Sequence, residues 1–244
     1  RDFCLSRGLG DVYKRQGFHL PEVNPLLIHH AHSLATDTHP NETSCILVPL
    51  CGKSKDLIWL QKHFHQVIGV ELVPQAVKAF FEENQITPPH SLRNPFATYQ
   101  HSNLTLLQGD IFQMSSEHLE DQPIRAVFDR ASLIALPNEL RKNYVALLRG
   151  LVSPNTKLLL VTLAYEDGVI SGPPHSVPEN EIFELFAFAT NIELLEKQDI
   201  LPESPNFQKA GLRWALSLIH ISEPTRQAEI SVDVCCFKKI GGGG

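Results

Sequence analysis

The sequence predicts an α/β protein in which a mostly parallel sheet carries helices on both faces. Short apolar segments alternate along the chain with longer segments of helical period. The short segments are apolar at consecutive positions, as Ile46–Val48 are, which is typical of strands buried on both faces. Several of these predicted strands are followed by acidic residues. The same pattern therefore also predicts a ligand site at the carboxyl edge of the sheet.

The first predicted unit, residues 45–72, has the pattern of a strand, a helix and a second strand. Its first strand is the apolar run Ile46–Val48, and a tight turn follows it. A helical pattern over 55–65 then leads to a second apolar strand, which closes on Glu71. This βαβ unit places an acid at the carboxyl end of its second strand.

The spacing of Glu71 indicates a nucleoside-containing cofactor. Glu71 lies 19 residues after Gly52, close to the roughly 20-residue spacing at which an acid binds the ribose hydroxyls of a dinucleotide. The turn has only Gly52, however, where three glycines bring a backbone against a pyrophosphate. A cofactor with a ribose and no phosphate fits better, and S-adenosylmethionine is the common one.

The tripeptide Gly52-Lys53-Ser54 matches only the end of a nucleotide-binding P-loop. Such a loop needs a second glycine five positions before Gly52, where this chain has Leu47 inside the predicted strand. The sequence therefore argues against a P-loop NTPase.

The remaining pattern continues the alternation of strands and helices. A helix is predicted over 25–33, ahead of the first strand. Prolines near Pro88 and Pro95 predict a loop of the kind that often forms a lid or is disordered, and whether it closes over a ligand stays open. The other predicted elements are helices over 74–85, 137–152 and 179–189, and strands over 104–107, 126–128, 157–163 and 192–197.

Two further predicted strands end in polar residues. Asp110 follows the third strand, and Asp129 with Arg130 follows the fourth. Because the carboxyl ends of parallel strands meet at one edge, we expect Glu71, Asp110 and Arg130 to lie close together. Taken singly, a turn aspartate or a surface ion pair of Arg130 would also explain them.

Composition suits a single domain that acts on a small molecule. The 244 residues are 43% hydrophobic and 20% charged, and no apolar run approaches a membrane span. The net charge is −6, and Lys and Arg are scattered rather than clustered. We expect a monomer with a small-molecule partner and without a nucleic-acid or membrane partner.

The cysteines and histidines predict no metal site. The five cysteines form no CxxC pair, and Cys51 has the place of a small buried thiol rather than a reactive one. The run with His29, His30 and His32 lacks the i, i+4 pair of a helical zinc site and contains no acid, which favours a solvated or packing role. With no recognisable signal peptide, this cysteine usage indicates a cytoplasmic protein.

Both ends of the chain lack the pattern of a native domain. Residues 1–16 join Gly17 without a turn or a cap. Near the other end, SLIHISEPTRQ resembles translated sequencing-adapter DNA, as GDVYKRQ does less specifically. We therefore expect a native domain of residues 17–215, with 1–16 and 216–244 as non-native extensions.

Short motifs occur in an order that is specific as a set. They are Gly17-Phe18-His19, PLCGKS over 49–54, Gly69-Val70-Glu71, Asp129-Arg130 and Gly172-Pro173-Pro174. Together they resemble the thiopurine S-methyltransferase family, particularly its bacterial members, over about residues 17–215. The resemblance implies a Rossmann-like class I S-adenosylmethionine-dependent methyltransferase fold.

Where residues match, the resemblance also implies roles. The cofactor-binding residues implied in this way are Leu50, Gly52, Glu71, Asp110, Ile111 and Arg130. Glu71 is expected to hold the ribose, while Asp110 and Ile111 border the adenine. Arg130 is expected to face the methyl-transfer site as the catalytic residue, and Phe18 to lie on the acceptor side.

The reaction implied is methyl transfer from S-adenosylmethionine to the sulfur of thiopurines or similar small thiols. One alternative is methyl transfer to halide, thiocyanate or a metalloid on the same scaffold. Another is a protein that binds the cofactor but is inactive. Members of the family have a Trp-containing segment before Gly17 and a final strand after about Ala215, and adapter-like residues stand at both places here.

Overall fold

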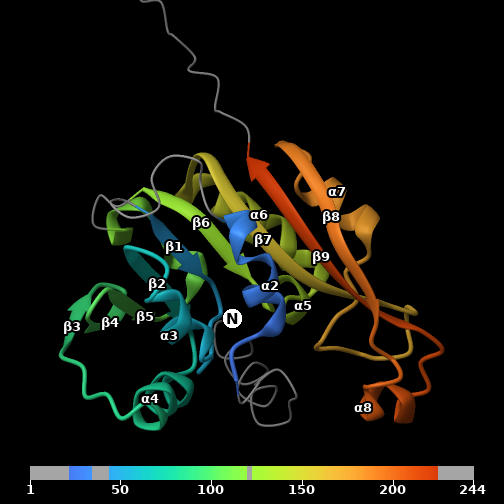
Figure 1. Ribbon diagram of the computed structural model, residues 1–244, viewed down its shortest axis with the longest axis horizontal. Coiled ribbons are helices and arrows are strands. Elements are labelled where there is room, and N and C mark those ends of the chain that lie inside the picture. The colour runs from blue at the N-terminus through green and yellow to red at the C-terminus, as the bar shows by residue number, and fades with distance from the viewer. Residues whose placement is uncertain (1–21, 35–43, 120–122, 225–244) are drawn as a thin grey trace, which may run out of the picture.

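A nine-stranded sheet forms the centre of the computed structural model, which describes residues 22–34, 44–119 and 123–224 (Figure 1). The strand order is β3-β4-β5-β2-β1-β6-β7-β9-β8. The strands are β1 (Cys45–Val48), β2 (Gln66–Glu71), β3 (His90–Arg93), β4 (Phe96–His101), β5 (Leu104–Gln108), β6 (Ile124–Asp129), β7 (Val152–Tyr165), β8 (Ala189–Asp199) and β9 (Ala215–Pro224). Phe18 lies outside the described residues.

The centre of the sheet is parallel, as the sequence predicts. Strands β5, β2, β1, β6 and β7 pair in parallel in this order. Both edges are antiparallel, with β3 and β4 beyond β5, and with β9 between β7 and β8. The parallel strands bring their carboxyl ends to one edge, where a ligand site is expected.

Helices cover both faces of the sheet. They are α2 (Pro25–Leu34), α3 (Asp56–Leu60), α4 (Pro74–Glu83), α5 (Ser132–Ala135), α6 (Asn138–Leu151), α7 (Glu179–Leu185) and α8 (Pro205–Lys209), with 3-10 turns η1 (Ile111–Gln113) and η2 (Ser116–Leu119). Side chains of α2, α3 and α4 pack in one core cluster, and those of α5, α6 and α7 pack in another on the opposite face. Within the described ranges, no helix is long and apolar enough to cross a membrane.

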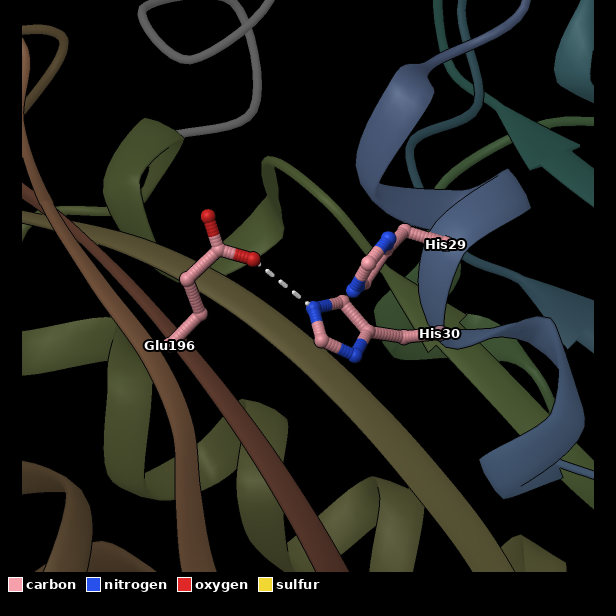
Figure 2. Close-up of side chains that lie close together, drawn as sticks. All are labelled: His29, His30 and Glu196. Carbon is pink, nitrogen blue, oxygen red and sulfur yellow. Dashed lines mark hydrogen bonds and ion pairs between the residues drawn. The ribbon is translucent and has the colours of Figure 1, made fainter.

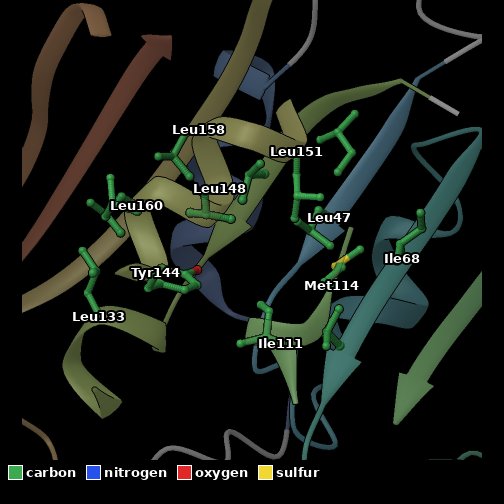
Figure 3. Packing of buried hydrophobic residues seen from close by; sticks show 14 of the residues in the cluster. Leu47, Ile68, Ile111, Met114, Leu133, Tyr144, Leu148, Leu151, Leu158 and Leu160 are labelled. Atoms are coloured by element: carbon green, nitrogen blue, oxygen red, sulfur yellow. The ribbon is translucent and has the colours of Figure 1, made fainter. Parts of the chain in front are cut away.

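The larger cluster lies under α6 (Figure 3). Leu148 of α6 joins Leu47 of β1 and Leu158 of β7 there, and all three side chains are at most 4% exposed. Burying a leucine contributes about 2 kcal/mol, so the apolar side of α6 holds it firmly on the sheet.

Residues 88–95, predicted as a loop, instead contain the outer strand of an edge hairpin and the connection to its second strand. β3 pairs with β4 from His90 opposite Tyr99 to Arg93 opposite Phe96, and a cis Asn94-Pro95 bond lies between the two strands. β3 carries no buried residue, and Leu92 is 77% exposed. Hydrophobic alternation is therefore missing, which is why the sequence pattern did not reveal the strand.

Candidate active site

The ends of the parallel strands are joined by backbone hydrogen bonds beyond the strands themselves. The amide of Cys51, in the turn after β1, donates to Val70 O at 3.0 Å. The amide of Gly109, after β5, donates to Glu71 O at 2.9 Å. These bonds bring the turn after β1, Glu71 and the start of the Asp110 turn to one edge, as the sequence predicts.

Glu71 has a fixed and mostly buried carboxylate. It is 7% exposed, and its Oε2 accepts from the amide of Gly52 at 2.8 Å while its Oε1 accepts from the amide of Val73 at 2.8 Å. Burial raises the pKa of Glu71, and the donating amides oppose that change. Each oxygen has a further lone pair, so the carboxylate is positioned to accept two ribose hydroxyls.

The turn after β1 has a backbone that few residues adopt. Leu50 has a φ of 45° and Gly52 a φ of 58°, both in the left-handed region that costs a non-glycine residue energy. Ser132 Oγ, from the segment after β6, donates to Pro49 O at 3.3 Å. The turn is thus held by β2 on one side and by the β6 segment on the other.

Close packing beneath this turn explains why small residues occupy positions 69 and 51. A Cβ on Gly69 would lie 3.0 Å from Cys51 Sγ, so a larger residue would displace the turn. Burial, and then the charge of Glu71, raise the pKa of the Cys51 thiol. The thiol is therefore a packing group, as predicted.

Lys53 is paired with an acid of α4. Its Nζ lies 2.5 Å from Glu83 Oε1 of α4. This ion pair agrees with the sequence argument against a P-loop NTPase.

Asp110 caps a turn, which is the simpler of its two predicted roles. Its Oδ1 accepts from the amide of Phe112 at 3.0 Å, at the start of η1. Ile111 is 5% exposed and belongs to the larger core cluster. The cap fixes both residues at the end of β5, next to Glu71.

Arg130 follows β6 and forms an ion pair, which is the simpler of the two roles that the sequence left open, although its partner Asp56 was not predicted. Its Nη1 lies 3.8 Å from Asp56 Oδ2, and Asp56 Oδ1 accepts from the amide of Asn24 at 2.7 Å. Burial lowers the pKa of Arg130, and Asp56 opposes that change. An acid in the first turn of α3 is usually a surface residue near the helix N-terminus, so Asp56 gave no sign of its burial.

Asp129 is a second buried acid, and its partners were also missed. It is fully buried, and it accepts from Tyr144 Oη at 2.6 Å and from the amide of Ser132 at 2.8 Å. Burial raises the pKa of Asp129, and these bonds oppose that change. The sequence placed Tyr144 only on the apolar face of a helix. A buried tyrosine hydroxyl needs a partner, and that need was the available signal.

The Gly172-Pro173-Pro174 motif has a structural explanation. Gly172 has a φ of 80°, and a Cβ there would lie 2.2 Å from the ring of His175. The hydroxyl of Tyr165 donates to Pro174 O, and the amide of His175 donates to Ile134 O at 2.7 Å. The motif therefore folds this loop against α5, just beyond Arg130 in the chain.

The family model for thiopurine S-methyltransferase (TPMT) matches residues 12–222. The chain belongs to the thiopurine S-methyltransferase family. It is 46% identical over 198 residues to a Thiopurine S-methyltransferase of Pseudomonas fluorescens, which covers 80% of this chain and 87% of that protein. A protein of the same name from Pseudomonas aeruginosa is 40% identical over 207 residues, 85% of this chain and 92% of its own length.

Solved structures confirm the predicted class I methyltransferase fold. A SAM-dependent methyltransferase from Anabaena variabilis superposes with a TM-score of 0.57 at 14% identity, covering 82% of this chain and 84% of its own. One from Methanosarcina mazei also has a TM-score of 0.57 at 14% identity, covering 84% and 100%. Family membership gives S-adenosylmethionine-dependent methyl transfer as the reaction, with S-adenosylmethionine as the cofactor.

The residues present fit this cofactor. Glu71 offers an anchored carboxylate of the kind that binds a ribose. The nearby lysine, Lys53, is engaged by Glu83, and the turn has the single Gly52 where a pyrophosphate site has three glycines. The donor set of this edge is therefore compatible with a ribose that carries no phosphate.

Proposed function

We propose that this chain methylates the sulfur of thiopurines or similar small thiols. The curated relatives named Thiopurine S-methyltransferase support this acceptor. The observation that carries the proposal is the edge where Glu71 ends β2 and Arg130 follows β6, because these two strands lie on either side of β1. Glu71 would hold the cofactor, which would supply the methyl group, and Arg130 would act on the acceptor from the same edge of the sheet.

The cofactor-holding residues have separate tasks. Glu71 binds the ribose hydroxyls, and the turn of Leu50 and Gly52 lies against the cofactor. Asp110 and Ile111 border the adenine, because the cap of η1 places them beside Glu71. S-adenosylmethionine supplies a methyl group on a sulfonium, which is a good leaving group.

Arg130 orients the attacking sulfur. Its side chain is 18% exposed, so its charge acts on an anionic sulfur in a poorly solvated place, where electrostatic attraction is strong. The acceptor sulfur would form a bond to the methyl carbon as the bond from that carbon to the sulfonium breaks, and the cofactor would leave as a neutral thioether. From the protein, this step needs positioning and exclusion of water, with little demand for a general base. Phe18 is proposed to line the acceptor side.

We expect Arg130→Ala to lower kcat/KM for a thiopurine by about 10- to 100-fold, because the substrate anion loses its counter-charge. Binding of S-adenosylmethionine should change less, by about threefold at most. Methylation assays and calorimetry on the same preparations measure the two effects. Arg125→Ala, at the other end of β6, is the matched control and should leave both unchanged.

An unchanged methylation rate in Arg130→Ala would remove the assigned role. The acceptor itself is tested on the unaltered chain with a panel of a thiopurine, a simple thiol, iodide, thiocyanate and arsenite. Preference for an inorganic acceptor would replace the proposed substrate class. Cofactor binding without turnover of any acceptor would show an inactive protein.

We also propose that residues 17–215 form the native domain and that 1–16 and 216–244 are foreign to it. The family match overlaps both boundaries by several residues, and residues 216–224 form most of β9. Within the described residues, five buried side-chain polar atoms have no hydrogen-bond partner, and three of them lie on this strand: the two ring nitrogens of His220 and Ser222 Oγ. The other two, Thr98 Oγ1 and Thr162 Oγ1, lie inside 17–215, so the concentration on β9 is what supports the proposal.

His220→Leu is expected to stabilise the protein by about 1–3 kcal/mol, because an unsatisfied buried group is replaced by an apolar one. Burial lowers the pKa of His220, and Glu179 opposes that change. Below the ordinary histidine pKa, the unfolded chain therefore gains a proton that the folded chain does not, and wild-type stability falls. Denaturant unfolding measures the free energy of unfolding of His220→Leu and of the wild type at pH 7 and pH 5.5. The advantage of the variant should be larger at pH 5.5. Replacement of the exposed His101 is the control, and a loss of stability in His220→Leu would contradict the proposal.

We further propose that the protein is cytoplasmic and acts as a monomer on small molecules. The acidic net charge of −6, without clustered basic residues, supports a small-molecule partner over nucleic acid. Light scattering on the full chain tests the monomer, and a dimer mass would overturn that part.

A further inference from the structure

We propose that His29, His30 and Glu196 form a binding site for a divalent transition metal such as Zn²⁺, separate from the methyltransferase edge. One ring nitrogen of each histidine and one carboxylate oxygen of Glu196 all lie within 4.8 Å of one another. Figure 2 shows the two rings on α2 and the carboxylate reaching toward them from β8. The histidine run lacks an i, i+4 pair and contains no acid, which is why its sequence favours a solvated or packing role; Glu196 lies 166 residues from His30.

The ligand set has the chemistry that zinc prefers. Two imidazoles and a carboxylate are the protein ligands of one common class of zinc site, and they leave a position for water. Zn–N and Zn–O bonds of about 2.0–2.2 Å in a tetrahedron separate the ligand atoms by roughly 3.3–3.5 Å. His30 Nε2 and Glu196 Oε2 are already 3.0 Å apart. A rotation of the exposed His29 side chain brings in the third ligand.

The position of Glu196 depends on an irregularity of the edge strand. Leu194 lies opposite His220 and Glu196 lies opposite Ile219, so the register shifts between them. Without that shift Glu196 would lie opposite Leu218 and point to the other face of the sheet. Ile219 packs with Leu27 of α2 in one core cluster, so the bulge directs Glu196 to the face that α2 covers.

The two histidines are held differently. His30 is 7% exposed, and its ring packs edge-on against that of His29, with centroids 4.7 Å apart. Side chains at adjacent positions of a helix leave its axis in different directions. His29 and His30 alone therefore do not surround an ion, and a third ligand must come from outside the helix. Glu196 is that ligand. For a neutral His30 to bind through Nε2, its proton must reside on Nδ1, a tautomer open to imidazole.

A metal here would join α2 to the edge strand β8. Such a link stabilises the folded state in proportion to metal affinity, because the unfolded chain does not hold the three ligands together. An oxygen-preferring ion such as Mg²⁺ is not expected to bind, since it favours carboxylates and water over imidazole.

The test is Zn²⁺ titration of the full chain, carrying no affinity tag, by calorimetry and by thermal unfolding. We expect one saturable site that His29→Ala and Glu196→Gln each weaken by about 10- to 100-fold, and a Zn²⁺-dependent rise in melting temperature that both variants lose. His32→Ala is the matched control, because His32 is exposed and its Nδ1 contacts only the backbone carbonyl of His29 among the described residues.

His29 is exposed, so His29→Ala should fold as the wild type does without metal. This variant therefore separates the metal site from the simple hydrogen bond between His30 and Glu196. Equal Zn²⁺ affinity in His29→Ala and the wild type, equal weakening by His32→Ala, or no saturable binding to the wild type would each overturn the proposal.

Discussion

Replacing Glu71 by Gln is expected to weaken binding of S-adenosylmethionine by about 100-fold. Each hydrogen bond from a ribose hydroxyl to a charged acceptor contributes about 1.5–3 kcal/mol, and the variant removes the charge from both. The amide group also donates where the carboxylate accepts. The NH2 group of the glutamine therefore faces another donor, the backbone N–H of Gly52 or that of Val73. This clash of two donors disturbs the turn that lies against the cofactor.

Calorimetric titration below the melting temperature of the variant measures this effect. Glu82→Gln is the matched control, because Glu82 is on the exposed side of α4 and pairs only with Lys78 among the described residues. A folded Glu71→Gln protein that binds the cofactor as the wild type does would falsify the ribose-binding role.

Replacing Asp129 by Ala is expected to destabilise the fold by about 3–5 kcal/mol. The change leaves the hydroxyl of Tyr144 and the amide of Ser132 without their acceptor, and each unsatisfied buried donor costs about 1–3 kcal/mol. For a domain of this size, the melting temperature should fall by roughly 10 °C. Ser132 also contacts Pro49 O, so the turn after β1 should loosen as well.

Denaturant unfolding of three variants separates the contributions. Tyr144→Phe removes one donor and should cost less than Asp129→Ala. The double variant should lose less free energy of unfolding than the two single variants lose together. With Tyr144 replaced by Phe, removal of Asp129 no longer leaves an unsatisfied hydroxyl. Asp167→Ala, in an exposed loop, should change stability little. Additive effects in the double variant would show that the Asp129–Tyr144 bond does not stabilise the fold.

Much of the site was predictable because its chemistry follows strand ends. Buried parallel strands are apolar throughout, so their ends are visible in the sequence, and parallel strands bring those ends together. This places Glu71, Asp110 and Arg130 at one edge from sequence alone. The spacing of Gly52 and Glu71 was visible for the same reason, since one βαβ unit contains both.

Edge elements were less predictable. The sequence predicts a loop where β3 lies, because this strand is exposed on both faces and the prolines near Pro88 and Pro95 indicate irregular structure. At an edge, backbone pairing holds such a strand together with a few local contacts, such as the stacking of His90 on Tyr99, and these leave little trace in side-chain patterns.

The sequence by itself determined the alternation of strands and helices, the strand-end residues and the family. Only the tertiary structure decided which polar groups meet: Asp56 with Arg130, Asp129 with Tyr144, and Glu196 with His30. The physical reason is that periodic burial is a local property of the chain. Pairing between distant residues depends instead on packing and register, and a single bulge in β8 sets the side of the sheet on which Glu196 lies.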